Sequence, residues 1–368
     1  MATLLSIPTT VAVLSAASST LSRVVASMAP GTWAQMSVRN QSAVLGIGDN
    51  TGTVLPYTNA MPWNSQKRRI EILARDHQDG AVGLGIRHAS YDEATDSFVS
   101  HGRYPEFPRG HGYDHTEVNP FTGDLYHRPY GSYSDAPARV YKQALGGTGW
   151  ALVPSIRVRD GITCGTCWWS GPFTGGSGLG AQGGFVVYTA AFSRNTASDG
   201  EIAIFDPVSN SWIFHATGVA PFQPDGYHES MAYSRAKNVA VYGGTNPSPR
   251  RIWKMISTGA TSVLTDVPSS AAGVGVHKGI LVDDPVTGNF LLLSRTSGGP
   301  ALFELNPDGA GTWTLQTGTR VPPSSVGSPG NTGPNNCVMG VPLPDHGVVA
   351  FIRQSGSANG AFWLYRHA

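Results

Sequence analysis

The amino-acid sequence predicts an all-β fold, a six-bladed β-propeller preceded by a short N-terminal helical segment. Three observations lead to this prediction. Similar units of four short apolar segments recur about every 50 residues, most of these units end on an aromatic residue, and charged residues make up only 13% of a chain rich in glycine and proline. Seven blades are the alternative, if residues 41–101 hold one more unit.

The composition limits the classes of partner. The 368 residues include 46 glycines and 26 prolines, and the formal net charge is +1. Helical surfaces normally carry many Lys and Glu side chains, so this composition favours short strands joined by turns. A net charge near zero gives no electrostatic reason to expect a nucleic-acid partner, and we expect none.

The first thirty residues form a separate segment, 1–30, ahead of the propeller at 31–368. This segment has no Lys/Arg-rich start, so a cleaved secretory signal is the weakest interpretation, and it is too polar to span a membrane. Its apolar residues fit about two heptads of a helix at Leu14, Ala17, Leu21, Val24 and Met28. We therefore predict an anchor or oligomerisation helix, with a helix packed on its own domain as the alternative.

The repeat divides the remaining chain into six units, in which turn residues separate apolar strands, as in "NPFTGDLYHRPYG" and "DDPVTGNFLLLSR". We expect blades at 50–101, 110–153, 162–217, 226–268, 274–320 and 333–368. The last unit lacks a fourth strand, and "PGTWAQMS" at 30–37 repeats the "GTW" of 311–313. Strand 30–37 is therefore predicted to pair with the C-terminal blade and close the ring, which removes two exposed sheet edges.

Two rows of polar residues recur when the units are aligned. His111, His228 and His277 stand near the start of three innermost strands, with Cys164 and Asn336 at similar places. A second row ends the second strands, at Arg75, Arg128, Arg295 and Arg353. Innermost strands line the channel of a propeller, so we expect His111, Arg128, His228, His277, Arg295 and Arg353 to bind a ligand, such as a sugar carboxylate. Structural bonding of the arginines between blades is the alternative.

The three cysteines, Cys164, Cys167 and Cys337, do not form a recognisable metal or disulfide pattern. The single "TCGTC" motif has neither a second cysteine pair nor a βαβ context. We therefore predict no metal and no cofactor.

Several of these motifs resemble the kelch family. "VAVYGGTN" is similar to its doubled-glycine strand, and "YDEATDSF" and "FDPVSNSW" are similar to its Tyr-Asp…Trp half. The resemblance covers most of residues 31–368 and implies a propeller. It does not imply one activity, because kelch-like propellers include binding modules, oxidases and polysaccharide lyases.

These observations predict a non-enzymatic propeller that is attached through residues 1–30 to a homo-oligomer or a larger, virion-like assembly such as a phage spike or fibre. It would present a surface to a host glycan or protein, on a virion or at the cell exterior. The alternative is a polysaccharide lyase that cleaves an anionic, uronate-containing glycan. Its proton-transfer residues would come from His111, Tyr113, His115, Tyr227 and His228, with an arginine neutralising the carboxylate. An intracellular scaffold is a third interpretation.

Overall fold

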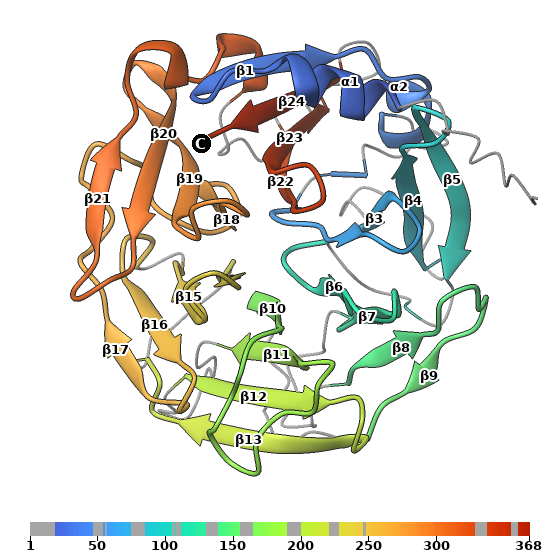
Figure 1. Cartoon of the computed structure of the whole chain (residues 1–368), viewed down its shortest axis with the longest axis vertical. Helices are drawn as coiled ribbons and strands as arrows, with labels where there is room; N and C mark the ends of the chain where they lie inside the picture. The colour runs from blue at the N-terminus through green and yellow to red at the C-terminus, as the bar shows by residue number, and fades with distance from the viewer. Residues whose placement is uncertain are drawn as a thin grey trace, which may run out of the picture.

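The computed structural model describes residues 19–46, 54–55, 57–74, 85–104, 107, 112–129, 139–154, 165–189, 200–220, 228–245, 248–327, 337–354 and 360–368. Within these ranges the chain forms six antiparallel sheets of four strands each, arranged as blades around a central axis (Figure 1). The predicted six-bladed propeller is thereby confirmed.

The first three blades follow one another along the chain, each from its innermost to its outermost strand. Blade 1 consists of β2 (Trp63–Asn64), β3 (Arg69–Ala74), β4 (Ile86–Asp92) and β5 (Ser97–Tyr104). Blade 2 consists of β6 (Thr116–Val118), β7 (Leu125–His127), β8 (Tyr141–Gln143) and β9 (Ala151–Leu152). Blade 3 consists of β10 (Gly165–Trp169), β11 (Gly184–Thr189), β12 (Glu201–Asp206) and β13 (Ser211–Thr217).

The remaining blades complete the circle. Blade 4 consists of β14 (Ser230–Ser234), β15 (Val239–Gly243), β16 (Ile252–Ile256) and β17 (Thr261–Val263). Blade 5 consists of β18 (Gly279–Asp283), β19 (Phe290–Thr296), β20 (Gly299–Asn306) and β21 (Thr312–Leu315). Blade 6 consists of β22 (Cys337–Leu343), β23 (Val348–Gln354) and β24 (Ala361–Arg366), with β1 (Thr32–Met36) as its outermost strand. Two 3₁₀ turns, η1 (Gly318–Arg320) and η2 (Ser324–Val326), lie between blades 5 and 6 in the chain.

Pairing between the two ends of the propeller closes the ring. β1 is antiparallel to β24, in a register that runs from Thr32 opposite Arg366 to Met36 opposite Phe362. Figure 1 shows β1 at the outer side of the last blade, next to β24. This confirms that strand 30–37 supplies the missing fourth strand, and it covers an edge of β24 that would otherwise expose unpaired backbone groups.

The recurring Asp in "YDEATDSF" and "FDPVSNSW" forms the turn between the last two strands of a blade. Asp92 Oδ1 accepts a hydrogen bond from Thr95 N at 3.0 Å, and Asp206 Oδ1 accepts one from Val208 N at 2.9 Å. Such side-chain bonds replace ladder bonds that the backbone loses where it reverses direction. The recurring Asp in the sequence is therefore explained by the hydrogen bonds that these turns need.

The innermost segments of neighbouring blades also bond to one another through their backbones. Tyr113 N donates to Tyr57 O at 2.6 Å, and Asn59 N donates to Tyr113 O at 2.9 Å. On the other side, Gly340 N donates to Asn59 O at 2.9 Å and Met61 N donates to Gly340 O at 3.2 Å. These parallel bridges fix blades 6, 1 and 2 to one another beside the axis.

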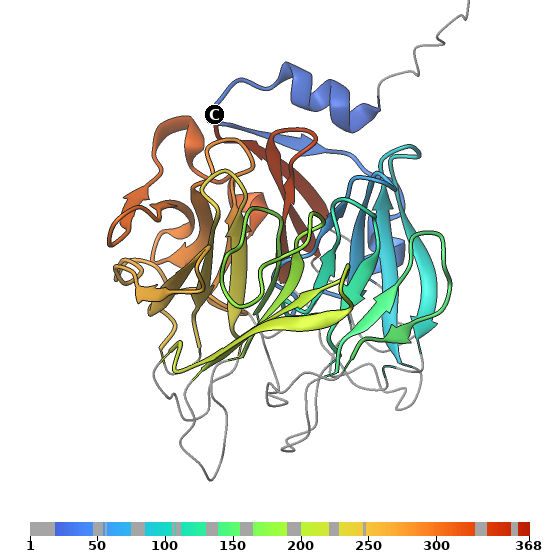
Figure 2. The same ribbon diagram turned by 60° about the horizontal axis from the view of Figure 1, so that its bottom comes forward.

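Helix α1 (Thr20–Ser27) lies above β1 on one face of the ring (Figure 2), and a second short helix, α2 (Gln41–Leu45), follows β1. Ser19 caps the N-terminus of α1 by accepting a hydrogen bond from Ser22 N. Leu21 of α1 is fully buried and belongs to the same apolar core as Met36 and Leu45. This helix is therefore part of the propeller's own core.

The assembly residues predicted from the heptad pattern divide into two groups. Leu14 and Ala17 lie outside the described residues. Leu21 and Met28 are buried against the propeller of their own chain, while Val24 is only half-buried and Val25 is buried instead. The described part of the segment thus follows the alternative of a helix packed on its own domain. No helix in the described ranges is long and apolar enough to cross a membrane.

Leu21→Ala should lower the free energy of unfolding by about 2–5 kcal/mol, because it opens a cavity under α1. Val24→Ala should cost less than about 1 kcal/mol, because that side chain already has solvent access. Chemical unfolding followed by circular dichroism measures both. Equal losses would show that Val24 belongs to a buried seam, as the heptad pattern predicts.

Candidate functional site

The six innermost strands surround the central axis (Figure 1), and the parallel bridges between blades 6, 1 and 2 show that neighbouring innermost segments run in the same direction. The two ends of the ring along this axis are therefore chemically different. We call the end where the innermost strands begin the His/Tyr mouth, defined by Tyr57, Tyr113, His228 and His277. The end where they finish is the tryptophan mouth, defined by Trp63, Trp168 and Tyr233.

Four aromatic rings gather at the His/Tyr mouth. The ring centroids of Tyr57 and His277 lie 4.6 Å apart, those of His228 and His277 lie 5.2 Å apart, and those of Tyr113 and His228 lie 5.6 Å apart. All four residues have left-handed backbone φ angles, between 39° and 71°. That conformation is uncommon for non-glycine residues, and it recurs here at equivalent places in blades 1, 2, 4 and 5.

The structure thus brings His228, His277 and Tyr113 together, and it adds Tyr57, which has no glycine-histidine motif to mark it. His115 is buried, with its ring 5.1 Å from that of Tyr113. His111 and Tyr227 lie outside the described residues.

The predicted arginines differ in burial and in bonding. Arg128 is fully buried, and Arg295 is exposed. Arg353 donates from Nη1 to Ser325 O at 3.2 Å, which ties blade 6 to η2. Arg75 lies outside the described residues. The bond made by Arg353 is structural, which is the alternative role expected for these arginines.

Buried polar groups cross the channel between the two mouths. Asp114 of blade 2 accepts a hydrogen bond from Met231 N of blade 4 at 2.7 Å, and its backbone carbonyl accepts one from Thr166 Oγ1 of blade 3 at 2.9 Å. Asn59 of blade 1 donates to Ser230 of blade 4. Complete burial raises the pKa of the Asp114 carboxyl well above its ordinary value.

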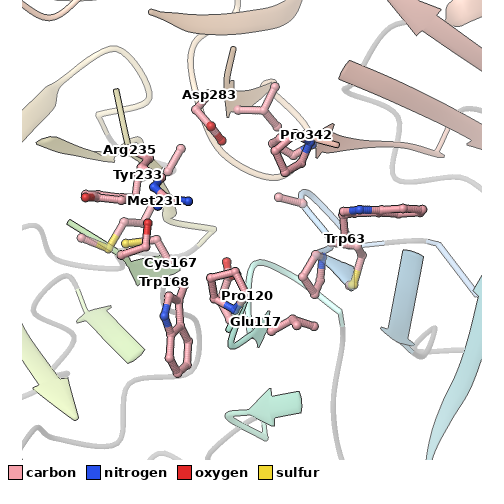
Figure 3. Close-up of a pocket in the computed structure, with 18 of the residues that line it drawn as sticks. Trp63, Glu117, Pro120, Cys167, Trp168, Met231, Tyr233, Arg235, Asp283 and Pro342 are labelled. Carbon is pink, nitrogen blue, oxygen red and sulfur yellow. The ribbon is translucent and has the colours of Figure 1, made fainter. Parts of the chain in front are cut away.

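A cavity of about 200 Å³ opens at the tryptophan mouth. Its apolar wall includes Trp63, Met231, Tyr233, Trp168, Pro120 and Pro342, contributed by blades 1, 2, 3, 4 and 6. Its polar groups include Glu117, Asp283, Arg235 and Cys167. Figure 3 shows the labelled residues surrounding one opening, with Trp63 on the opposite side of it from Tyr233 and Arg235.

The walls of this cavity are held rigidly. Trp168 Nε1 donates to Gln182 O at 3.0 Å, and its ring packs 5.1 Å from that of Tyr126. Tyr233 donates from its hydroxyl to Asn238 Oδ1 at 2.8 Å. Side chains fixed in this way lose little conformational entropy when a ligand binds.

The acids of the cavity have raised pKa values. Burial, with a smaller contribution from the charge of Asp284, raises the pKa of Asp283 to about 7. Burial raises the pKa of Glu117 well above its ordinary value, and the charges of Asp114 and Asp283 raise it further. The raised pKa values favour the protonated forms, and Asp283 is about half protonated near pH 7. A protonated carboxyl can donate as well as accept a hydrogen bond. Arg235 is exposed, with its guanidinium carbon 5.9 Å from the Phe121 ring centroid.

The cysteine of the cavity is unreactive as a nucleophile. Cys167 is a buried free thiol, and burial raises its pKa well above the ordinary value, as do the charges of Glu117 and Asp114. A protonated thiol is a poor nucleophile, so Cys167 contributes packing and shape to the cavity.

A polar network joins α1 to the rim of this mouth. Trp63 Nε1 donates to Asp345 Oδ2 at 2.8 Å, and Arg68 Nη1 lies 3.3 Å from the same oxygen. Arg68 Nε lies 2.7 Å from Glu93 Oε2, and the Glu93 carboxylate also accepts a bond from Ser19, the N-cap of α1. The helix therefore lies on the same face as the cavity and braces one of its walls.

The sequence did not reveal the tryptophan mouth. Its residues stand at or just past the ends of innermost strands, in "CWWS", "AYSR" and "LVDD", whereas the recurring histidines mark the beginnings. Comparing the last residues of the six strands would have gathered Trp168, Tyr233, Arg235 and Asp283.

Comparisons with known proteins identify the fold. No protein-family model and no curated protein matches the sequence. A lectin, SapL1, solved with α-methyl fucoside, is 15% identical over 85% of this chain and 94% of its own, with a TM-score of 0.50. A protein of unknown function from Bacteroides thetaiotaomicron is 11% identical over 90% of this chain and 76% of its own, with a TM-score of 0.51. These likenesses show a six-bladed propeller, and kelch proteins in particular gain no further support.

Asp283→Asn should change how stability depends on pH. Because the folded-state pKa of about 7 exceeds the ordinary 3.8, the neutral carboxyl favours folding below pH 3.8, and this contribution is lost as the pH rises to 7. The free energy of unfolding of the wild type relative to Asp283→Asn should therefore fall between these pH values and stay level above 7. Urea unfolding at several pH values measures it, and a constant difference would contradict the raised pKa.

Proposed function

We propose that the protein is a binding propeller that takes a neutral glycan, end-on, into the cavity at the tryptophan mouth. The observation that carries the proposal is the convergence there of aromatic walls and hydrogen-bonding side chains around one opening (Figure 3).

The size and chemistry of the cavity support a sugar. About 200 Å³ is less than the roughly 300–1,000 Å³ of pockets that enclose drug-sized ligands, so the cavity admits a single ring-sized group. The C–H face of a sugar ring packs on aromatic side chains such as Trp63 and Trp168, while its hydroxyls need donors and acceptors at fixed positions. Protonated Glu117 and Asp283 supply both, and Arg235 supplies donors at the rim.

The charge of the cavity favours a neutral sugar over a uronate. Glu117 and Asp283 both line the space, and Asp114 lies close enough to raise the pKa of Glu117. A ligand carboxylate would be repelled by the ionised fraction of Asp283, so a uronate should bind less well as the pH rises above 7. The SapL1 lectin, which shares the fold, was solved with the neutral methyl glycoside of fucose, and such glycosides are the first ligands to test.

Arg235→Ala should weaken binding of the best neutral methyl glycoside roughly 5- to 30-fold, the effect of losing about one hydrogen bond to a charged donor. Arg295→Ala is the matched control, because that arginine is also exposed but lies near the end of β19, toward the opposite mouth. Isothermal titration calorimetry against neutral glycosides and uronic acids measures both. An affinity of Arg235→Ala equal to that of the wild type, or tighter binding of uronic acids than of neutral glycosides, would contradict the proposal.

The lyase alternative gains no support from the described residues. It requires an arginine beside the histidine and tyrosine that transfer protons. His228, His277 and Tyr113 do gather, but Arg128, one of the two arginines considered for this role, is fully buried. Arg295, the other, is exposed near the end of β19.

Attachment through residues 1–30, to a homo-oligomer or a virion-like assembly, remains a proposal that rests on the apolar pattern of the sequence. Because α1 belongs to the propeller core, the informative truncation begins at Ser19 and keeps the helix. If residues 1–18 mediate assembly, light scattering should show an oligomer for the full chain and a monomer for the truncated one. Equal masses would contradict this role.

A further inference from the structure

A cluster of two imidazoles and one carboxylate lies in blade 1, away from both mouths. Glu71 of β3 and His88 of β4 are buried, and His101 of β5 is exposed. His88 Nε2 lies 2.8 Å from Glu71 Oε2, and His88 Nδ1 lies 3.0 Å from the Tyr104 hydroxyl. His101 Nε2 lies 2.8 Å from Ser90 Oγ, and the two imidazole centroids are 4.5 Å apart. Three neighbouring strands thus present three ligand-type side chains to one point.

We propose that Glu71, His88 and His101 form a binding site for a divalent transition-metal ion, of which Zn²⁺ best suits the donors. One ligand atom from each residue lies within 4.8 Å of the other two. Around a tetrahedral Zn²⁺ with bonds of about 2.0–2.2 Å, ligand atoms lie about 3.4 Å apart. The His88 and Glu71 ligand atoms, now 2.8 Å apart, would therefore separate slightly, while His101 would move inward. Two imidazole nitrogens and one carboxylate oxygen leave a fourth position open to water.

The backbone of β5 helps to place the exposed ligand. The β4–β5 register shifts between His88 and Ala89, so that His101 is an extra residue opposite them. Such bulges turn a side chain away from its regular direction. Because His101 is also exposed, it has room for the movement that metal binding requires.

Neighbouring side chains hold the ligands in place for a metal ion. The contact of His88 Nε2 with Glu71 Oε2 at 2.8 Å holds the carboxylate toward the imidazole, and metal binding would release the proton that this pair shares. The Tyr104 hydroxyl on the second nitrogen of His88 would orient that ring, as outer partners of metal-bound histidines do.

The protein holds a related arrangement that lacks the second histidine. In blades 5 and 6, His367 Nε2 lies 3.1 Å from Glu304 Oε1, and the Tyr365 hydroxyl lies 3.1 Å from His367 Nδ1. The same Glu–His–Tyr chain of hydrogen bonds therefore joins blades 5 and 6 there, without a second histidine beside it among the described residues. The second imidazole, His101, is what distinguishes the blade 1 cluster.

One neighbouring charge opposes the ion. Lys67 Nζ lies 3.4 Å from Glu71 Oε1, the carboxylate oxygen that does not face His88. The lysine holds the carboxylate with Oε2 toward the imidazoles, but its positive charge repels a metal ion. Lys67→Gln should therefore bind metal roughly three- to tenfold more tightly. A purely structural Glu–His pair predicts no such gain.

The test uses the full-length protein, freed of metal with a chelator and titrated with Zn²⁺ by calorimetry and with Co²⁺ by visible absorption. One ion per chain is expected, with the absorption of a low-symmetry Co²⁺ site. His101→Ala should raise the Kd more than about tenfold, and because the residue is exposed the variant should fold. His215→Ala is the matched control, since His215 of β13 also lies near a glutamate, with its Nε2 3.6 Å from Glu201 Oε2.

Three results would overturn the site: no saturable Zn²⁺ binding by the wild type, an unchanged Kd in His101→Ala, or an equal loss in His215→Ala. Weaker binding in Lys67→Gln would also count against the proposed ligand geometry. Glycan binding plays no part in these measurements, so the two proposals stand or fall separately.

Discussion

Ring closure is the constraint on which the rest of the molecule depends. The bonds between β1 and β24 join residues that are more than 300 positions apart in sequence, and only with them does the last blade have four strands. Closure fixes the number of blades, and that number sets the width of the channel and the spacing of the six innermost strands. It also places α1 beside the first blade, where Leu21 completes the core.

The common direction of the innermost strands makes the two ends of the channel different. Strand beginnings bring together residues with left-handed backbones, among them His228 and His277. Strand ends bring together Trp168, Tyr233 and Asp283. Asp114 bonds across the axis between these ends and ties blades 2, 3 and 4 at one point. A single repeated unit can therefore supply two mouths with unrelated chemistry.

Polar side chains have two uses in this fold. The bonds of Glu304 to His367, and of Arg353 to η2, are explained by the joining of neighbouring elements. The cluster of Glu71, His88 and His101 uses the same kinds of contact but adds a further metal-binding donor at a bulge. A structural contact thus needs little change to become a ligand site, because burial has already fixed two of the three side chains.

The sequence by itself determined the fold class, the number of blades and the closing strand, because turn residues such as Asp92 and Asp206 and closing aromatics such as Trp33 recur at a regular spacing. It also indicated that His228 and His277 occupy equivalent places. Only the tertiary structure decided which ends of the strands form a cavity, that Arg128 is buried while Arg295 is exposed, and that α1 packs on its own chain. A repeat in sequence specifies local hydrogen bonding within one blade, whereas a site arises from side chains of several blades whose convergence depends on the closed ring.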